Sequence, residues 1–276
     1  MYKRQAYIKA SNTGASDNFG TSLSLSGDGS RLTVGAPNED SNATGINNDQ
    51  TDNSATNSGA VYIYSRTGIV WTQEAYIKAS NTEANDRFGE KMSLSADGSR
   101  LAVSAISESS NATGVNGIET DNSLNSAGAV YIFSRTGMTW VQEAYIKASN
   151  TDANDRFGQV VSFSGDGSRF AVGASGESSS STGINGIETD NSLNSSGAAY
   201  LFEYNGGVWS QIKYIKASNT GVQDNFGISL SLNSDGSYLC VGAPSEQSNA
   251  TGVSSNFIDQ LDNSLSGAGA AYMFIN

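Results

Sequence analysis

Residues 6–37 read AYIKASNTGASDNFGTSLSLSGDGSRLTVGAP, and this stretch decides the fold because it returns three more times along the chain. Its Phe-Gly pair marks the phase, and the first residues of the four pairs are Phe19, Phe88, Phe157 and Phe226. Successive differences (88−19, 157−88 and 226−157) are each 69. A long fixed period indicates one supersecondary unit repeated along the chain. The sequence therefore predicts a single domain, residues 1–276, built of four 69-residue repeats.

Apolar residues alternate with polar ones inside each repeat, which predicts short strands. Leu23 and Leu25 alternate with serines, and the Asp28-Gly29 pair that follows is a strong hairpin signal, because Gly accepts the positive φ of such turns. Further strands are expected at 32–36, 60–64 and about 71–79. No segment shows a sustained period of about 3.6 residues, so helix should be nearly absent. The pattern predicts an all-β, four-bladed β-propeller with four antiparallel strands per blade.

Two recurring sets of side chains are interpreted as packing residues. Small side chains on the innermost strand would let the blades approach an axis closely; these are Ser24, Ser93, Ser162 and Ser231. Aromatic side chains near the fourth strand are expected to pack on that outer strand; these are Trp71, Trp140 and Trp209. The lone thiol, Cys240, stands where other repeats have small residues and is interpreted as a packed side chain.

The two ends of the chain fall inside the repeat. Position 71−69 holds Tyr2, so the chain begins within a fourth strand, whereas residues 269–274 read as a third strand. Pairing of residues 2–10 with residues 269–275 would close the ring within one chain and remove its free sheet edges. We therefore expect a closed ring and a monomer. The alternative is an open arc of four blades that pairs with a second copy.

Composition excludes several classes of function. The chain has no histidine, which excludes Ser-His-Asp triads, Cys-His dyads and histidine-ligated zinc sites. The net charge of −12 argues against nucleic acid and anionic membranes as partners, because both attract basic surfaces. The acidic surface, rich in Asn, Ser and Thr, suits a protein located outside the cell or on its surface.

Acidic residues recur in register at four places in the repeat. Those in the hairpin turn, such as Asp28, can bond the turn backbone and are interpreted as structural. Those two residues before each phenylalanine are expected to accept backbone N–H groups in the turn between blades; they are Asp17, Asp86, Asp155 and Asp224. A lysine lies nearby in each repeat and could pair with this aspartate; the four are Lys9, Lys78, Lys147 and Lys216.

The other two acidic positions bracket the long loop between the second and third strands. Because these strands are neighbours, the loop ends must lie close together, and carboxylates, amides and carbonyls there could form an all-oxygen shell that suits Ca²⁺. The candidate calcium ligands are Glu39, Asp52, Asn53, Glu108, Asp121, Asn122, Glu177, Asp190, Asn191, Glu246, Asp262 and Asn263. The alternatives are that these groups satisfy the loop backbone or that they catalyse a reaction. No other cofactor is expected.

Phe19-Gly20 followed by Val34-Gly35-Ala36-Pro37 resembles the FG-GAP repeat of integrin α-subunit propellers and their bacterial relatives. The last repeat matches equally well, with Phe226-Gly227 and residues 241–244, whereas the middle repeats depart at residues 103–106 and 172–175. Integrin repeats often carry an Asp-rich calcium loop, but residues 26–30 are too short for one. The resemblance implies a β-propeller used for binding or adhesion outside the cell.

We expect a non-catalytic binding or adhesion protein whose partner is an extracellular protein or a glycan. Two alternatives are a carbohydrate-active enzyme that uses loop carboxylates, and a structural spacer within a larger secreted protein. The long loops should emerge at the same end as the Asp-x-Phe-Gly turns and form the binding face. Each loop carries one apolar residue expected to anchor it to its blade; these are Ile46, Val115, Ile184 and Val253.

Overall fold

The computed structural model describes residues 6–253 and 260–275, which contain strands, turns and loops and no α-helix. Accordingly, none of these residues belongs to a helix long and apolar enough to cross a membrane. The strands of the first sheet are β1 (Ser22–Leu25), β2 (Arg31–Ala36), β3 (Ala60–Thr67) and β4 (Val70–Ile77). Those of the second are β5 (Phe88–Leu94), β6 (Arg100–Ala105), β7 (Ala129–Thr136) and β8 (Thr139–Ile146).

The third sheet contains β9 (Val160–Phe163), β10 (Arg169–Ala174), β11 (Ala198–Asn205) and β12 (Val208–Ile215). The fourth contains β13 (Ser229–Leu232), β14 (Tyr238–Ala243) and β15 (Ala270–Ile275). Within each sheet the strands are antiparallel and follow one another in chain order. This is the repeat predicted from the sequence: one sheet for every 69 residues, although the last sheet has three described strands.

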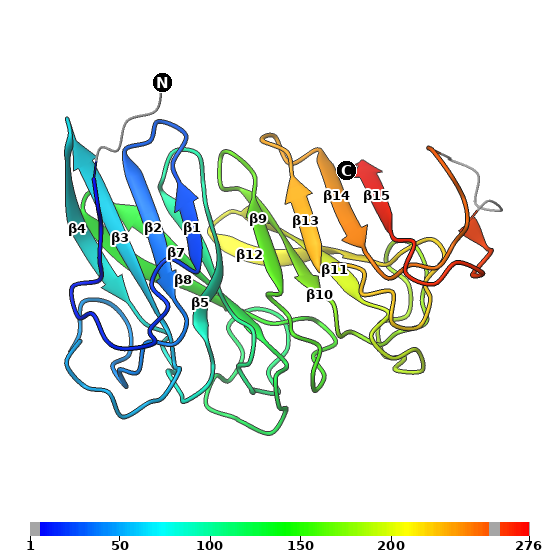
Figure 1. Cartoon of the computed structure of the whole chain (residues 1–276), viewed down its shortest axis with the longest axis horizontal. Coiled ribbons are helices and arrows are strands. Elements are labelled where there is room, and N and C mark those ends of the chain that lie inside the picture. Colours follow the sequence, from blue (N-terminus) through cyan, green and yellow to red (C-terminus); the bar gives the residue numbers. More distant parts are fainter. Residues whose placement is uncertain (1–5, 254–259, 276) are drawn as a thin grey trace.

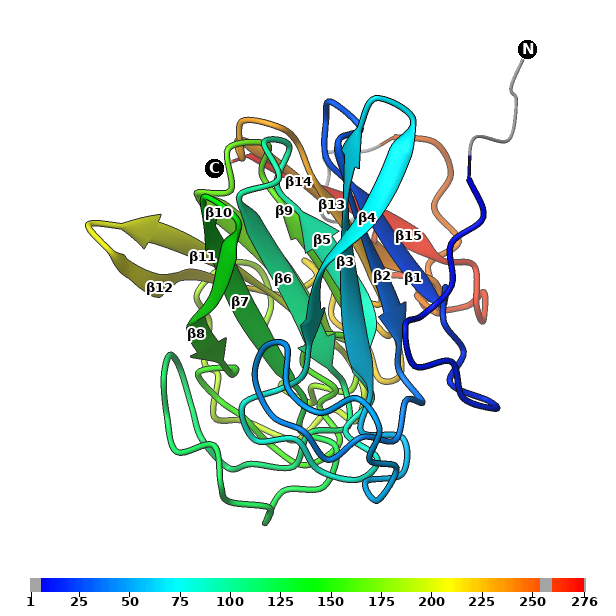
Figure 2. The same ribbon diagram turned by 90° about the vertical axis from the view of Figure 1, so that its left-hand side faces the viewer.

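The sheets stand side by side in chain order, from the first at one end of the long axis to the fourth at the other (Figure 1). Within each sheet the hairpin turns lie at one end of the strands and the long loop at the other, and Figure 2 shows this clearly for the first two sheets, with the hairpins at the top and the long loops at the bottom. The sequence therefore predicted correctly which loops share an end.

The first strands of neighbouring sheets are joined by the recurring serines. Ser24 Oγ accepts the backbone N–H of Leu94 at 2.9 Å. The corresponding hydroxyls of Ser93 and Ser162 accept the N–H groups of Phe163 and Leu232 at 3.0 and 3.1 Å. Packing alone therefore does not describe Ser24, Ser93 and Ser162, because each of these three hydroxyls also links its strand to the next sheet.

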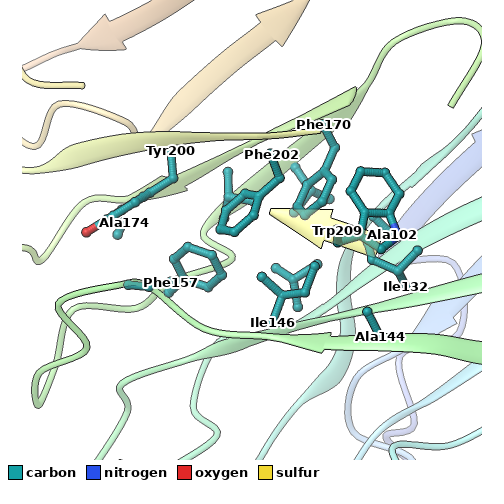
Figure 3. Packing of buried hydrophobic residues seen from close by; sticks show 14 of the residues in the cluster. Ala102, Ile132, Ala144, Ile146, Phe157, Phe170, Ala174, Tyr200, Phe202 and Trp209 are labelled. Carbon is teal, nitrogen blue, oxygen red and sulfur yellow. The ribbon is translucent and has the colours of Figure 1, made fainter. Parts of the chain in front are cut away.

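The hydrophobic core lies between successive sheets. Between the second and third sheets, Phe170 stacks on Phe202 with ring centroids 4.9 Å apart, and Trp209 meets Phe170 edge-on at 5.0 Å (Figure 3). The same cluster includes Ile132 and Ile146 of the second sheet. Trp140 and Trp209 are both buried, which confirms the packing role predicted for these two tryptophans.

The glycines of the repeat explain how closely the sheets approach. A Cβ on Gly35 would lie 2.1 Å from the carbonyl oxygen of Gly89, and one on Gly173 would lie 1.8 Å from that of Gly227. Only glycine lets two backbones approach so closely. The Gly of the Gly-Ala motif in one sheet therefore packs against the Gly of the Phe-Gly pair in the next.

The predicted closure of a ring within one chain is not seen in the described residues. Residues 6–10 form no strand, and the described part of the chain pairs β15 with β14 alone. Instead, residues 9 and 10 lie on the first sheet, because Tyr64 Oη donates to the Lys9 carbonyl at 2.9 Å and Ala10 is buried in that sheet's cluster. Residues 2–5 lie outside the described residues.

Candidate functional site

Each of the first three repeats holds a buried carboxylate at the start of its long loop. Glu39 follows β2 and is buried. Its Oε2 lies 2.8 Å from the Nζ of Lys78, and its Oε1 accepts the hydroxyl of Tyr76 at 2.9 Å and the Nδ2 of Asn12 at 2.8 Å. Tyr76 belongs to β4 and Lys78 follows it directly, so the outer strand and the long loop are held together. We call this arrangement of Glu, Tyr, Lys and Asn the brace.

The brace recurs with nearly the same geometry. In the second repeat, Glu108 lies 2.7 Å from Lys147 Nζ and 2.8 Å from Tyr145 Oη. In the third, Glu177 lies 2.6 Å from Lys216 Nζ and 2.8 Å from Tyr214 Oη. All three lysines and all three tyrosines are buried.

Burial governs the protonation of the brace. It lowers the pKa of Lys78, and the neighbouring Glu39 carboxylate opposes that shift. Burial, together with the Glu39 charge, raises the pKa of Tyr76, so this hydroxyl stays protonated and donates. The brace is therefore a neutralised ion pair with its remaining oxygen atoms satisfied by hydrogen bonds, as a buried carboxylate requires.

The sequence suggested that the four recurring lysines pair with the aspartates before Phe-Gly. Three of them pair with glutamates instead; these are Lys78, Lys147 and Lys216. Lys9 is exposed and forms no ion pair in the described part of the chain. The aspartates hold the turn between sheets as predicted, since Asp17 Oδ2 accepts the N–H of Gly14 at 2.6 Å and Asp224 accepts that of Gly221 at 2.6 Å. Burial raises the pKa of Asp86 to about 7 and that of Asp155 to about 8.

The structure separates the acids that were grouped as calcium ligands. The loop ends do meet, because Gly59 donates its N–H to the Glu39 carbonyl at 2.8 Å. The side chain of Glu39, however, points into the brace, whereas Asp52 Oδ1 accepts the N–H and hydroxyl of Ser54 at 2.8 and 2.7 Å.

The same separation holds in the other repeats. The Ser54-type contact recurs for Asp121, Asp190 and Asp262, which accept the N–H groups of Ser123, Ser192 and Ser264. Hydrogen bonds lower the pKa of Asp190 to about 2, and the largest effect is that of the Ser180 hydroxyl. Asn122 and Asn191 donate to Glu83 and Asp152 of the turn between sheets. Among residues 6–253 and 260–275, no three acidic or thiol side chains cluster as they would around a metal. Calcium binding remains a prediction.

The long loops are anchored as predicted in three repeats. Ile46, Val115 and Ile184 form antiparallel bridges with Ile77, Ile146 and Ile215 of the outer strands. Val253 has no such bridge among the described residues and is fully exposed. The fourth sheet lacks a described outer strand, so this loop residue has nothing to pair with there.

Polar grooves open at the long-loop end where one repeat meets the next. One, of about 430 Å³, lies between the first and second repeats. Its lining includes the charged residues Glu83, Asp86 and Arg87 and the polar residues Asn57, Asn85, Ser107, Ser109, Asn122 and Asn125. A second, of about 370 Å³, lies between the third and fourth repeats. Its lining includes Ser195, Gln223, Asn225, Ser245, Gln247 and Ser266.

These grooves occupy the same place in the repeat. Two periods separate Asn57 from Ser195 (195−57 is 138), and the same offset relates Ser107 to Ser245. Residues at both rims adopt positive φ without being glycine, among them Asn85 at 72° and Gln223 at 61°. Such conformations cost free energy and gather at ligand sites in many proteins.

Two features were not predicted from the sequence. One is the part that tyrosine and asparagine play in the brace, and the other is the pair of polar grooves. Tyr76, Lys78 and Asn81 recur with the same period as the glutamates, so the signal was present. The period alone could not identify the partners, because each lysine recurs at a fixed separation from an aspartate as well as from a glutamate.

A model of the FG-GAP repeat family matches residues 2–64, 71–133 and 140–202. No curated protein sequence matches the chain. Among solved structures, hydrazine synthase of Kuenenia stuttgartiensis is similar, with 13% identity over 81% of this chain and 44% of that chain and a TM-score of 0.42.

A putative TolB of Agrobacterium tumefaciens is also similar, with 13% identity over 82% of this chain and 54% of that chain and a TM-score of 0.39. The chain spans about half the length of these two proteins. The three family matches begin at Tyr2, Trp71 and Trp140, one period apart, and together they cover most of the chain. The chain belongs to the FG-GAP repeat family.

Proposed function

We propose that the protein is a non-catalytic glycan-binding propeller of the cell exterior, with four blades, whose binding sites are the grooves at the long-loop end. The observation that carries this proposal is the recurrence of one polar groove at equivalent junctions of the repeat. Loops held on a rigid scaffold are the usual place for binding residues. Here the brace supplies the rigidity, because it ties each of the first three long loops to its outer strand.

The polar residues that the two grooves share, serine and asparagine, favour a hydroxyl-rich ligand, and the groove between the first and second repeats also has the charged residues Glu83, Asp86 and Arg87 in its lining. Volumes of a few hundred Å³ suit small ligands. The groove between the third and fourth repeats is lined by serine, asparagine, glutamine and glycine, with no charged side chain in its lining. Amides and hydroxyls both donate and accept hydrogen bonds, which matches the alternating donors and acceptors of sugar hydroxyls. A protein partner would be better served by an apolar centre.

The even repetition of the acids favours binding over catalysis. Paired catalytic carboxylates need environments that push their pKa values apart. Here Glu39, Glu108 and Glu177 are each paired with a lysine in the same way.

The test is binding to a panel of immobilised neutral glycans. Ser107→Trp together with Ser245→Trp would fill both grooves, whereas Thr67→Trp together with Thr136→Trp would place the same bulk at the hairpin end. We expect the wild type and the hairpin-end variant to bind the same glycans. The groove variant should not bind them, although its melting temperature should equal that of the wild type. Binding of the groove variant to the same glycans, or failure of the wild type to bind any glycan, would overturn the proposal.

A further inference from the structure

We propose that the outer edge of β15 is a docking site for the N-terminal segment, residues 2–10, of a second copy of this chain, so that copies join head to tail. This inference is independent of the glycan sites. It rests on four gaps in the last repeat and on the side chains that the N-terminal segment offers to fill them.

The first gap is an incomplete brace. Glu246 is only 3% exposed and keeps the Asn219 Nδ2 contact at 2.6 Å. In the described part of the chain, no lysine or arginine lies within ion-pair distance of it. Subtracting one period from Tyr76 and Lys78 gives Tyr7 and Lys9. Tyr7 is 80% exposed and Lys9 is exposed as well. A buried carboxylate without a cation is costly, so charge complementarity favours this pairing.

The second gap is the sheet edge itself. The third strand is buried in the first three sheets, where Ile63, Ile132 and Leu201 are at most 2% exposed. Their counterpart on β15, Met273, is 65% exposed. An unpaired strand edge is a ready template for pairing with another chain. Ile8, the counterpart of Ile77, would also give Val253 a bridge partner, which it does not have among residues 6–253 and 260–275.

The third gap is an apolar hollow between the third and fourth sheets. It is lined by Leu201, Ile215, Leu232, Leu239 and Phe274, among others. The equivalent side chains between the first two sheets surround a tryptophan; they are Ile63, Ile77, Leu94, Leu101 and Phe133, packed with Trp140. At the corresponding position the N-terminal segment offers Tyr2, where the first family match begins.

The fourth gap is the uncovered side of β13 in the last repeat, and β1 in the first repeat has a matching uncovered side. Ser231 is exposed, whereas the other serines of its set accept an N–H from the next sheet. Leu25 on β1 is 56% exposed, although its counterparts Leu94, Phe163 and Leu232 are each 7% exposed. Placing β13 of one copy beside β1 of another would cover Leu25 and give Ser231 its N–H donor.

A second copy is favoured over closure within one chain by the arrangement of the sheets. The first and fourth sheets lie at opposite ends of the long axis (Figure 1), and the extensive contacts of the first sheet with another sheet are all with β5. Closure within one chain would have to change three packed junctions. Head-to-tail joining repeats the existing junction unchanged. Such a contact produces a ring if the rotation closes and a filament if it does not.

The test is the solution mass of the full chain and of two charge-reversal variants, Glu246→Lys and Lys9→Glu, measured by light scattering. The wild type should have at least twice the monomer mass of 28.7 kDa. Each variant alone brings like charges together and should be monomeric. An equal mixture restores an opposite-charge pair at every junction and should regain the wild-type mass.

Leu25→Asp keeps the test decisive if Glu246→Lys fails to fold, because it alters a side chain that is already exposed. Circular dichroism should show this variant folded, and its mass should be that of the monomer. A wild type that stays at 28.7 kDa at every concentration would overturn the proposal in favour of a single-chain ring or an isolated arc. Variants that assemble like the wild type, or a mixture that stays monomeric, would overturn it as well.

Discussion

Replacing Lys147 by methionine should lower the free energy of unfolding by about 3 kcal/mol, the lower part of the range for breaking a buried ion pair. The change leaves Glu108 buried without its ammonium partner at 2.7 Å. The carboxylate still accepts hydrogen bonds from Tyr145 at 2.8 Å and from Asn81 and the N–H of Ser110 at 3.2 Å each. Because these donors remain, we expect the loss of unfolding free energy to lie in the lower part of the range for breaking a buried ion pair.

Two companion variants separate the charge from the packing. Adding Glu108→Gln to Lys147→Met removes the stranded charge and should recover roughly half of the loss, because replacing both partners costs less than removing one. Lys91→Met is the matched control, since Lys91 is 42% exposed and lies 4.0 Å from Glu90. An exposed pair of this kind contributes about 0–1 kcal/mol.

The assay is urea unfolding followed by circular dichroism, with the slope compared between variants so that a shift in the midpoint reports stability. A loss of about 3 kcal/mol for Lys147→Met, against less than about 1 for Lys91→Met, would support the brace. Equal losses for the two lysine variants would refute the reasoning that the buried ion pair holds the long loop to its blade.

Burial raises the pKa of Asp86 to about 7 and that of Asp155 to about 8, so their stabilising contribution is present at acid pH and is lost as the pH rises through these values. The melting temperature of the wild type should therefore fall between pH 5 and pH 9. In the double variant Asp86→Asn with Asp155→Asn, the melting temperature should fall less over the same range. Gly173→Ala should cost about 1–3 kcal/mol in urea unfolding, because its Cβ would lie 1.8 Å from the Gly227 oxygen; a neutral effect would mean that the sheets can separate freely. If the loop acids bind calcium, the melting temperature in calcium should be several degrees higher than in chelator. The difference should be larger in Lys78→Met, which leaves Glu39 without its ammonium partner. Equal melting temperatures in calcium and in chelator, for the wild type and for Lys78→Met, would remove this prediction.

The strands could be predicted from the sequence because their signals are local. Leu23, Leu25 and the Asp28-Gly29 turn specify a hairpin without reference to any other repeat. The aspartates before Phe-Gly also act locally, since Asp17 bonds Gly14 three residues away. The end at which the long loops emerge followed from the antiparallel order alone.

The brace, and the lack of pairing between residues 6–10 and β15 in the described part of the chain, could not be predicted in the same way, because both depend on contacts between distant segments. Lys78 pairs with Glu39 because both are buried behind the outer strand, and burial is not visible in a period. Ile63 of the first sheet packs in one buried cluster with Leu94 and Trp140 of the second, and a contact of this kind between sheets is not visible in a period either. Four repeats therefore predicted four sheets, but not whether their ends meet.

Calorimetric titration with a neutral oligosaccharide, chosen because the protein binds it in the glycan panel, tests whether equivalent grooves at the long-loop end bind the ligand. We expect more than one equivalent site in each chain. Ser107→Trp should remove the site between the first and second repeats and lower the stoichiometry while the remaining sites keep their Kd. Ser245→Trp should do the same at the junction of the third and fourth repeats. A single site whose stoichiometry and Kd are unchanged by both substitutions would contradict binding in these grooves.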